Sequence, residues 1–112
     1  MQVFRKKLDV YIGRNYPREI TNLKLNGVIF DFSAQGITKV GIEFDGKEFT
    51  SDDDGNYISF SGASIFLRLG GIPNLIPGKF SARIIVYSNN LPAGKPIITE
   101  KTSYRLDLNF IA

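Results

Sequence analysis

Hairpin signals constrain the fold of this chain more than any other feature of its sequence. Asp45-Gly46 lies within residues 37–50 and Asn26-Gly27 within residues 20–32, each next to a run in which apolar residues recur at every second position. Such pairs favour a two-residue turn, because both turn positions need a positive φ that Asn, Asp and Gly adopt at low cost. The sequence therefore predicts two β-hairpins in its first half.

Strand-like segments continue along the chain without any helical period. They recur about every 8–12 residues with turn residues between them, a spacing typical of all-β folds. We therefore expect an antiparallel β-sandwich, immunoglobulin-like or jelly-roll-like, with about 7–9 strands. Residues 80–87 are predicted to form a central strand, and residues 88–96 a loop because of Asn89-Asn90, Pro92 and Gly94. The inward positions predict a core of Val28, Phe30, Val40, Ile42, Phe44, Ile65, Leu67, Leu69, Ala82, Ile84, Val86, Leu106 and Leu108.

The length of 112 residues fits one domain. Residues 1–19 are expected to form an N-terminal arm or an extra edge strand, and residues 20–112 the sandwich. The start has no apolar core long enough for a signal peptide, so we take Met1 as the native start of a protein made in the cytoplasm.

The sequence contains no His, no Cys and no Trp. It therefore lacks the commonest general base, the best nucleophile and the usual nitrogen and sulfur ligands of transition metals. Gly70-Gly71 does not predict a phosphate-binding glycine loop, because the Lys and the Ser or Thr of that motif are missing. We expect a protein that is not an enzyme and needs no cofactor.

One acidic cluster could hold a cation. Asp52, Asp53 and Asp54 are adjacent and precede Gly55-Asn56. An EF-hand calcium loop spaces its acids at alternate positions and ends with a Glu, which is missing here. Adjacent Asp and Asn residues are also typical of a solvated turn, because their side chains bond to their own backbone. We favour the turn and keep these three Asp residues as metal candidates.

The net charge of +3 is spread along the chain, with one small cluster at Arg5, Lys6 and Lys7. Nucleic-acid-binding proteins usually concentrate such charge in a patch or stripe, so we do not expect nucleic acid as the partner. No run of about 18 apolar residues exists, so a membrane span is not expected either.

Both ends of the chain suggest contacts with other subunits. The last run, residues 106–112, ends inside an apolar strand that must be covered by its own sheet or by a neighbour. The first 19 residues could reach such a neighbour, although both ends could equally dock on their own domain. Deleting residues 1–19 should on this view spare the fold and abolish assembly. The candidate interaction residues are Arg5, Lys6, Lys7, Tyr11, Tyr16, Asn109, Phe110 and Ile111.

One stretch carries a family resemblance. Its segments are Leu67-Arg68-Leu69-Gly70, Ile76-Pro77-Gly78-Lys79-Phe80, Ala82-Arg83-Ile84-Ile85-Val86-Tyr87 and Asn90-Leu91-Pro92-Ala93-Gly94. They resemble small β-rich structural proteins of tailed phages and prophages, of tail, baseplate or virion accessory type. The resemblance implies a non-enzymatic assembly protein that forms a homo-oligomer, contacts other structural subunits and enters a virion.

A second function stays open on the residues alone. Exposed Tyr side chains and the loop of residues 52–56, with or without calcium, could bind carbohydrate or another cell-surface ligand, because aromatic rings stack on apolar faces and keep a polar handle.

Overall fold

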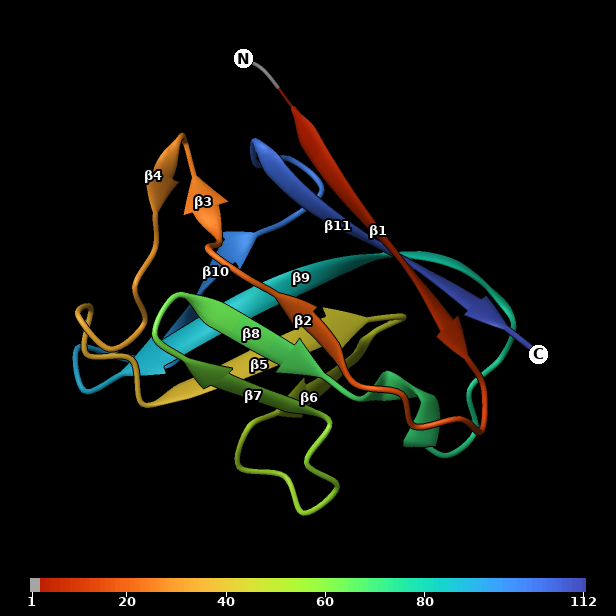
Figure 1. Ribbon diagram of the computed structural model, residues 1–112. Coiled ribbons are helices and arrows are strands. Elements are labelled where there is room, and N and C mark those ends of the chain that lie inside the picture. Colours follow the sequence, from red (N-terminus) through yellow and green to blue (C-terminus); the bar gives the residue numbers. More distant parts are fainter. Residues whose placement is uncertain (1–2) are drawn as a thin grey trace.

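The computed structural model describes residues 3–112, and Met1 and Gln2, the start of the predicted arm, lie outside the described residues. The described chain is all-β, as predicted, and contains no α-helix (Figure 1). The elements are β1 (Phe4–Tyr11), β2 (Arg18–Ile20), β3 (Lys24–Leu25), β4 (Val28–Ile29), β5 (Lys39–Phe44), β6 (Lys47–Thr50), β7 (Ile58–Ser61), β8 (Ser64–Leu67), the short 3-10 turn η1 (Leu69–Gly71), β9 (Gly78–Ser88), β10 (Leu91–Ile98) and β11 (Tyr104–Ile111).

The larger sheet is built around β9. Its strand order is β1-β11-β9-β5-β6, and β10 also pairs with β9. Both β5 and β10 pair with Ile85, so they lie on opposite edges of β9. The prediction of a central strand over residues 80–87 is confirmed.

The larger sheet is mixed, which corrects the expectation of wholly antiparallel pairing. β1 runs parallel to β11, with Phe4 opposite Tyr104 and Tyr11 opposite Ile111. Parallel neighbours need a long connection, and here nearly the whole domain lies between the two strands. Local turn signals in the sequence cannot reveal a pairing between the two ends of a chain.

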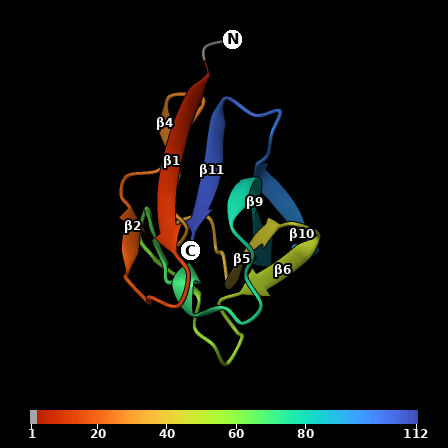
Figure 2. The same cartoon turned by 90° about the vertical axis from the view of Figure 1, so that its right-hand side faces the viewer.

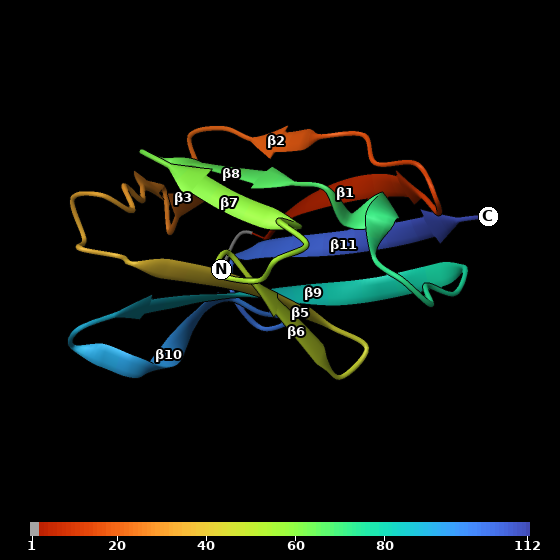
Figure 3. The same ribbon diagram turned by 90° about the horizontal axis from the view of Figure 1, so that it is seen from below.

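A smaller antiparallel sheet has the order β2-β8-β7, and β3 pairs only with β4. Figure 3 shows β2, β8 and β7 on one side of the molecule and β9, β5 and β10 on the other. Side chains from both sides meet in one core, for example Ile65 of β8 and Ile84 of β9, which are each 0% exposed. The described residues thus form eleven strands rather than about 7–9, because several are very short.

Both predicted hairpin turns are confirmed. Asn26 and Gly27 have φ values of 53° and 80°, and Asp45 and Gly46 have φ values of 52° and 74°. These are the left-handed conformations that a two-residue turn requires. The first hairpin is shorter than predicted, because β3 and β4 contain two residues each.

Most of the predicted core is buried, with two exceptions. Val28 is 69% exposed and Phe30 is only half-buried. Only Val28 and Ile29 of this segment form a strand, and the short β3–β4 hairpin projects from the domain and leaves Val28 uncovered. Alternation shows which residues share a face, and it does not show whether that face is covered.

Strand β10 corrects a predicted loop. Residues 91–98 pair with β9 despite Pro92, Gly94 and Pro96, and the pairing shifts register twice. Proline is tolerated at sheet edges and bulges, where its missing N–H is not needed.

None of the described helical segments is long and apolar enough to cross a membrane.

Candidate functional site

Strand β1 ends the larger sheet, and one of its edges is open. Figure 2 shows β1, β11 and β9 in succession, with β2 on the side of β1 away from β11. Among residues 3–112, no strand pairs with the outer edge of β1. An open strand edge carries unpaired N–H and C=O groups, which makes it a template for a further strand.

Two hydrogen bonds at the ends of β1 fix the direction of its backbone groups. Phe4 N–H donates to Ser103 O at 2.7 Å, and Ile12 N–H donates to Ile111 O at 2.8 Å. Successive residues of a strand direct these groups to opposite edges. The even-numbered residues of β1 therefore face β11, and the odd-numbered residues, 5 to 11, face the open edge.

The side chains of β1 alternate between core and solvent. Leu8 and Val10 are 1% and 7% exposed and belong to the core. Arg5, Lys7 and Asp9 are exposed on the opposite face of the strand. The sequence specifies this arrangement, because a one-residue slip would place three charged side chains in the core and two apolar ones in solvent.

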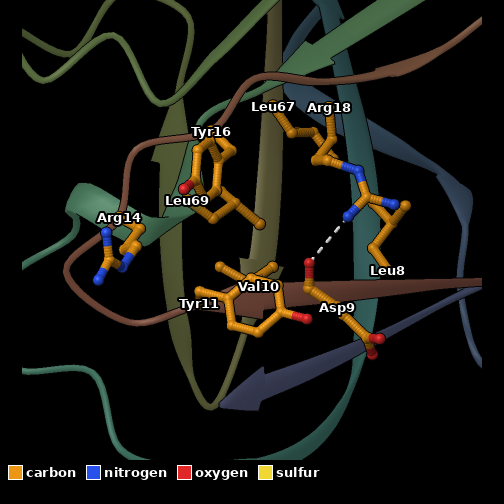
Figure 4. Close-up of a pocket in the computed structure, with 9 residues that line it drawn as sticks. All are labelled: Leu8, Asp9, Val10, Tyr11, Arg14, Tyr16, Arg18, Leu67 and Leu69. Atoms are coloured by element: carbon orange, nitrogen blue, oxygen red, sulfur yellow. Dashed lines mark hydrogen bonds between the residues drawn. The ribbon is translucent and has the colours of Figure 1, made fainter. Parts of the chain in front are cut away.

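Arg18 spans the space between the open edge and β2. Its guanidinium donates to the backbone oxygen of Asp9 at 2.9 Å, so a side chain and not a strand makes this contact (Figure 4). Around this bond lies a hollow of about 250 Å³ that is lined by both strands and by the Tyr11 and Tyr16 rings. The hollow leaves space along the second half of the open edge.

A broader groove follows the first half of β1. It has a volume of about 810 Å³ and lies between Phe4 and Lys6 on one side and residues 19–22 with Lys24 on the other. Phe4 is 57% exposed and its ring lies 5.1 Å from the ring of Tyr104. The hollow thus borders β1 from Leu8 to Tyr11, and the groove borders it at Phe4 and Lys6.

The charged side chains on the outer face of β1 differ in whether they have a partner. Arg5 forms an ion pair with Asp107 at 3.3 Å. Asn109 donates to Asp9 Oδ1 at 3.2 Å and so holds this carboxylate in place. Lys7 makes no ion pair with any of the described residues. The outer face of β1 therefore offers one uncompensated cation next to a positioned anion.

The structure brings five of the predicted interaction residues together. Arg5, Lys6, Lys7 and Tyr11 lie on β1, and Tyr16 lies across the hollow from it. The other three predicted interaction residues lie near the C-terminus. Asn109 contacts Asp9, Ile111 is half-buried, and Phe110 is a core residue.

The C-terminal strand is covered within the same chain. β11 lies between β1 and β9, and Phe110 packs 5.1 Å from Phe44 and 5.7 Å from Phe80, measured between ring centroids. Phe110 is therefore no candidate for contact with another subunit. Because Leu8 and Val10 belong to the core, deleting residues 1–19 would damage the fold, and the deletion does not separate folding from assembly.

Sequence reasoning missed Arg14 and Arg18. Both line the hollow, and Arg18 makes the only described side-chain bond to a β1 carbonyl within residues 3–112. Their positions after a Gly turn carry no signal in the sequence, since the return of the chain from β1 toward β2 is visible only in three dimensions.

The Asp-rich loop is a turn whose second carboxylate serves the backbone. Asp53 accepts from Thr50 N–H at 2.8 Å and from the Thr50 hydroxyl at 3.2 Å. Within the described part of the chain, no three acidic side chains converge as metal ligands would. Asp52 and Asp54 are exposed and make none of the side-chain hydrogen bonds found in residues 3–112.

A second polar cluster lies on the outer face of the larger sheet. The Tyr87 hydroxyl donates to Glu48, and the Lys39 ammonium lies 4.3 Å from the centre of the Tyr87 ring. The bond to Glu48, with some burial, raises the pKa of Tyr87 to about 12. Gly41 and Gly94 leave room for this packing, because a Cβ at Gly94 would lie 2.6 Å from the Tyr87 ring. The cluster is best explained as packing.

Comparison of this chain with family models, characterised proteins and solved structures finds no significant match. The site must therefore be interpreted from its own geometry.

Proposed function

We propose that this protein is a non-enzymatic assembly protein whose subunits join through the open edge of β1. The observation that carries the proposal is the row of outward backbone groups at residues 5, 7, 9 and 11, for which the described chain supplies no strand. Addition of a strand to such an edge supplies main-chain hydrogen bonds, and neighbouring side chains supply specificity.

The architecture that fits this role is a β-sandwich of immunoglobulin-like or jelly-roll type. Its support is the single core shared by the two sheets. Proteins usually protect an open sheet edge with charge, proline or a covering element. Here β1 carries the charged residues Arg5, Lys7 and Asp9, which would guard the edge against unspecific pairing and admit a matching partner.

The setting that we propose is a phage or prophage particle. Support for it comes from the resemblance over residues 67–94, which span the turn from β8 through η1 into β9 and the start of β10. Other structural subunits of such a particle would then be further partners. Isolation of this chain from purified virions, by mass spectrometry of particles, would test this setting separately from the edge.

Lys7→Pro tests the role of the edge. The Lys7 N–H faces outward, so proline removes no bond to β11, while its ring occupies the position of an incoming strand. We expect the wild-type chain to show a mass that rises with concentration in sedimentation equilibrium, and Lys7→Pro to stay monomeric with an unchanged circular dichroism spectrum.

Lys6→Pro is the matched control. Lys6 faces β11, so the same substitution one residue earlier removes a ladder hydrogen bond and should lower the thermal stability. A wild-type chain that is monomeric at every concentration, or a Lys7→Pro variant that associates like the wild type, would refute the proposal.

A carbohydrate-binding module is the second candidate. The structure places Tyr11 and Tyr16, 46% and 58% exposed, beside the same hollow as Arg14 (Figure 4). Two aromatic rings beside a cation suit a sugar, which needs stacking and hydrogen bonds. Binding to a glycan panel, with and without calcium, that is lost in Tyr16→Ala would support this function. Binding that is unchanged in Tyr16→Ala would exclude this hollow as the site.

A further inference from the structure

We infer that two copies of this chain pair through their β1 edges in one antiparallel register, with Lys7 opposite Asp9 of the second copy and Arg5 opposite Tyr11 of the second copy. This inference rests on the proposed function and adds the partner, the register and the residues that select it.

Edge geometry leaves few registers to consider. Two identical strands related by a two-fold axis run antiparallel, and whenever residue i lies opposite residue j, residue j lies opposite residue i. Backbone pairing also requires that residues facing the edge lie opposite each other, which here means residues 5, 7, 9 and 11. Three registers place at least three of these residues opposite one another.

Charge distinguishes these registers. One places Lys7 opposite Lys7, and another places Asp9 opposite Asp9. Like charges directly opposite each other destabilise a strand pair, and opposite charges stabilise it. The remaining register uses all four edge residues of each copy and forms the Lys7–Asp9 pair twice. It is the one register of the three without a repulsive pair.

The second pair in this register is also favourable. Arg5 lies opposite Tyr11, again twice, and both are exposed on the outer face of the sheet. A guanidinium over a tyrosine ring gains a cation–π interaction. The Arg5 side chain is half exposed in its ion pair with Asp107, so its planar group remains accessible to a second partner.

Within residues 3–112, the hydrogen bonds at this edge engage two carbonyl oxygens and none of its N–H groups. Asp9 O already accepts from Arg18, and Tyr11 O accepts from Arg14 N–H. A carbonyl oxygen has two lone pairs and can accept a second bond from the incoming strand. Asn109 holds the Asp9 carboxylate through one oxygen and leaves the other for Lys7 of the second copy.

Pairing of this kind closes on itself. Each copy uses its only open β1 edge, so the larger sheets join into one sheet across the dimer and the edge disappears. The contact therefore gives a dimer and cannot extend into a chain of many subunits. Any larger assembly would need another surface.

Charge exchange tests the register. Lys7→Asp places two like-charged pairs in the interface, and Asp9→Lys does the same with the opposite sign. Each single variant should raise the dimer Kd about tenfold or more, because two pairs change from attraction to repulsion. The double variant Lys7→Asp/Asp9→Lys restores opposite charges at both pairs and should return the Kd close to that of the wild type.

A mixture of the two single variants controls for loss of folding. Lys7→Asp carries only negative charges at these positions and Asp9→Lys only positive charges, so the two should form a heterodimer although neither dimerises well alone. Sedimentation equilibrium of each variant and of the equimolar mixture measures this. A folding defect in either variant cannot produce such complementation.

Two results would overturn the inference in distinguishable ways. If Lys7→Pro abolishes dimerisation but the single variants dimerise like the wild type, or the double variant stays monomeric, the edge is used in another register, and the proposed function stands while the inference fails. If the wild-type chain shows no dimer at any concentration, both fail.

Discussion

Replacement of Leu8 by Ala tests whether β1 is part of the folded domain or a detachable arm. Leu8 is 1% exposed and lies in the core. Substitution of a buried Leu by Ala removes its transfer free energy and leaves a cavity, which together cost about 2–5 kcal/mol. We expect a loss of about 3 kcal/mol, because an edge strand can relax into part of the space.

Such a loss is large relative to the whole. Domains of this size unfold with a free energy of about 5–15 kcal/mol, so Leu8→Ala would remove a fifth to more than half of it. The midpoint of thermal unfolding should fall by roughly 12 °C, since each kcal/mol corresponds to about 4 °C near this chain length.

Urea unfolding followed by circular dichroism measures the change, at a protein concentration low enough for the wild-type chain to be monomeric. Lys7→Ala on the same strand is the control, and as an exposed position it should change the free energy of unfolding by no more than about 0.5 kcal/mol. If Leu8→Ala cost less than about 1 kcal/mol, β1 would not be packed as described, and residues 1–19 would behave as a detachable arm.

Three further predictions concern the turns and the outer face of the sheet. Gly94→Ala should destabilise the fold by about 1–3 kcal/mol in the same urea assay, because the residue has a φ of 85° and its new Cβ would meet the Tyr87 ring. The pKa of Tyr87 is raised from about 10 to about 12, so Tyr87 contributes stability below pH 10 that is lost as the pH rises toward 12. Spectrophotometric titration should find the pKa of Tyr87 near 12, and Glu48→Gln should lower this pKa. Asp53→Ala should cost about 1 kcal/mol, because Thr50 N–H loses its acceptor, and an unchanged unfolding curve would show that water replaces the bond without loss.

Sequence patterns predicted the features that are local. The two hairpin turns follow from Asn26-Gly27 and Asp45-Gly46, because turn type depends on the φ values that these residues tolerate. The inward face of β11, from Tyr104 to Phe110, follows from strict alternation.

Features that depend on long-range arrangement were not predictable. The parallel pairing of β1 with β11 joins residues about a hundred positions apart, and the strand β10 lies in a segment whose prolines suggest a loop. Val28 alternates like a core residue, but its hairpin has no neighbour to cover it.

The candidate site was predictable as a set of residues and not as a surface. Arg5, Lys7 and Tyr11 were named from the N-terminal segment, yet their value depends on the direction of the β1 backbone, which only the pairing with β11 determines. Arg18 acts on this edge from another strand, and no spacing in the sequence connects it to Asp9.

Amide hydrogen exchange along β1, measured by NMR across a dilution series, tests the role of the edge most directly. The N–H groups of Leu8 and Val10 face β11 and should be protected at every concentration, so they serve as an internal control. The N–H groups of Lys7 and Asp9 face outward and should become protected only as the mass of the protein rises. If the protein associates while these two amides continue to exchange rapidly, the subunits join at another surface and not at the β1 edge.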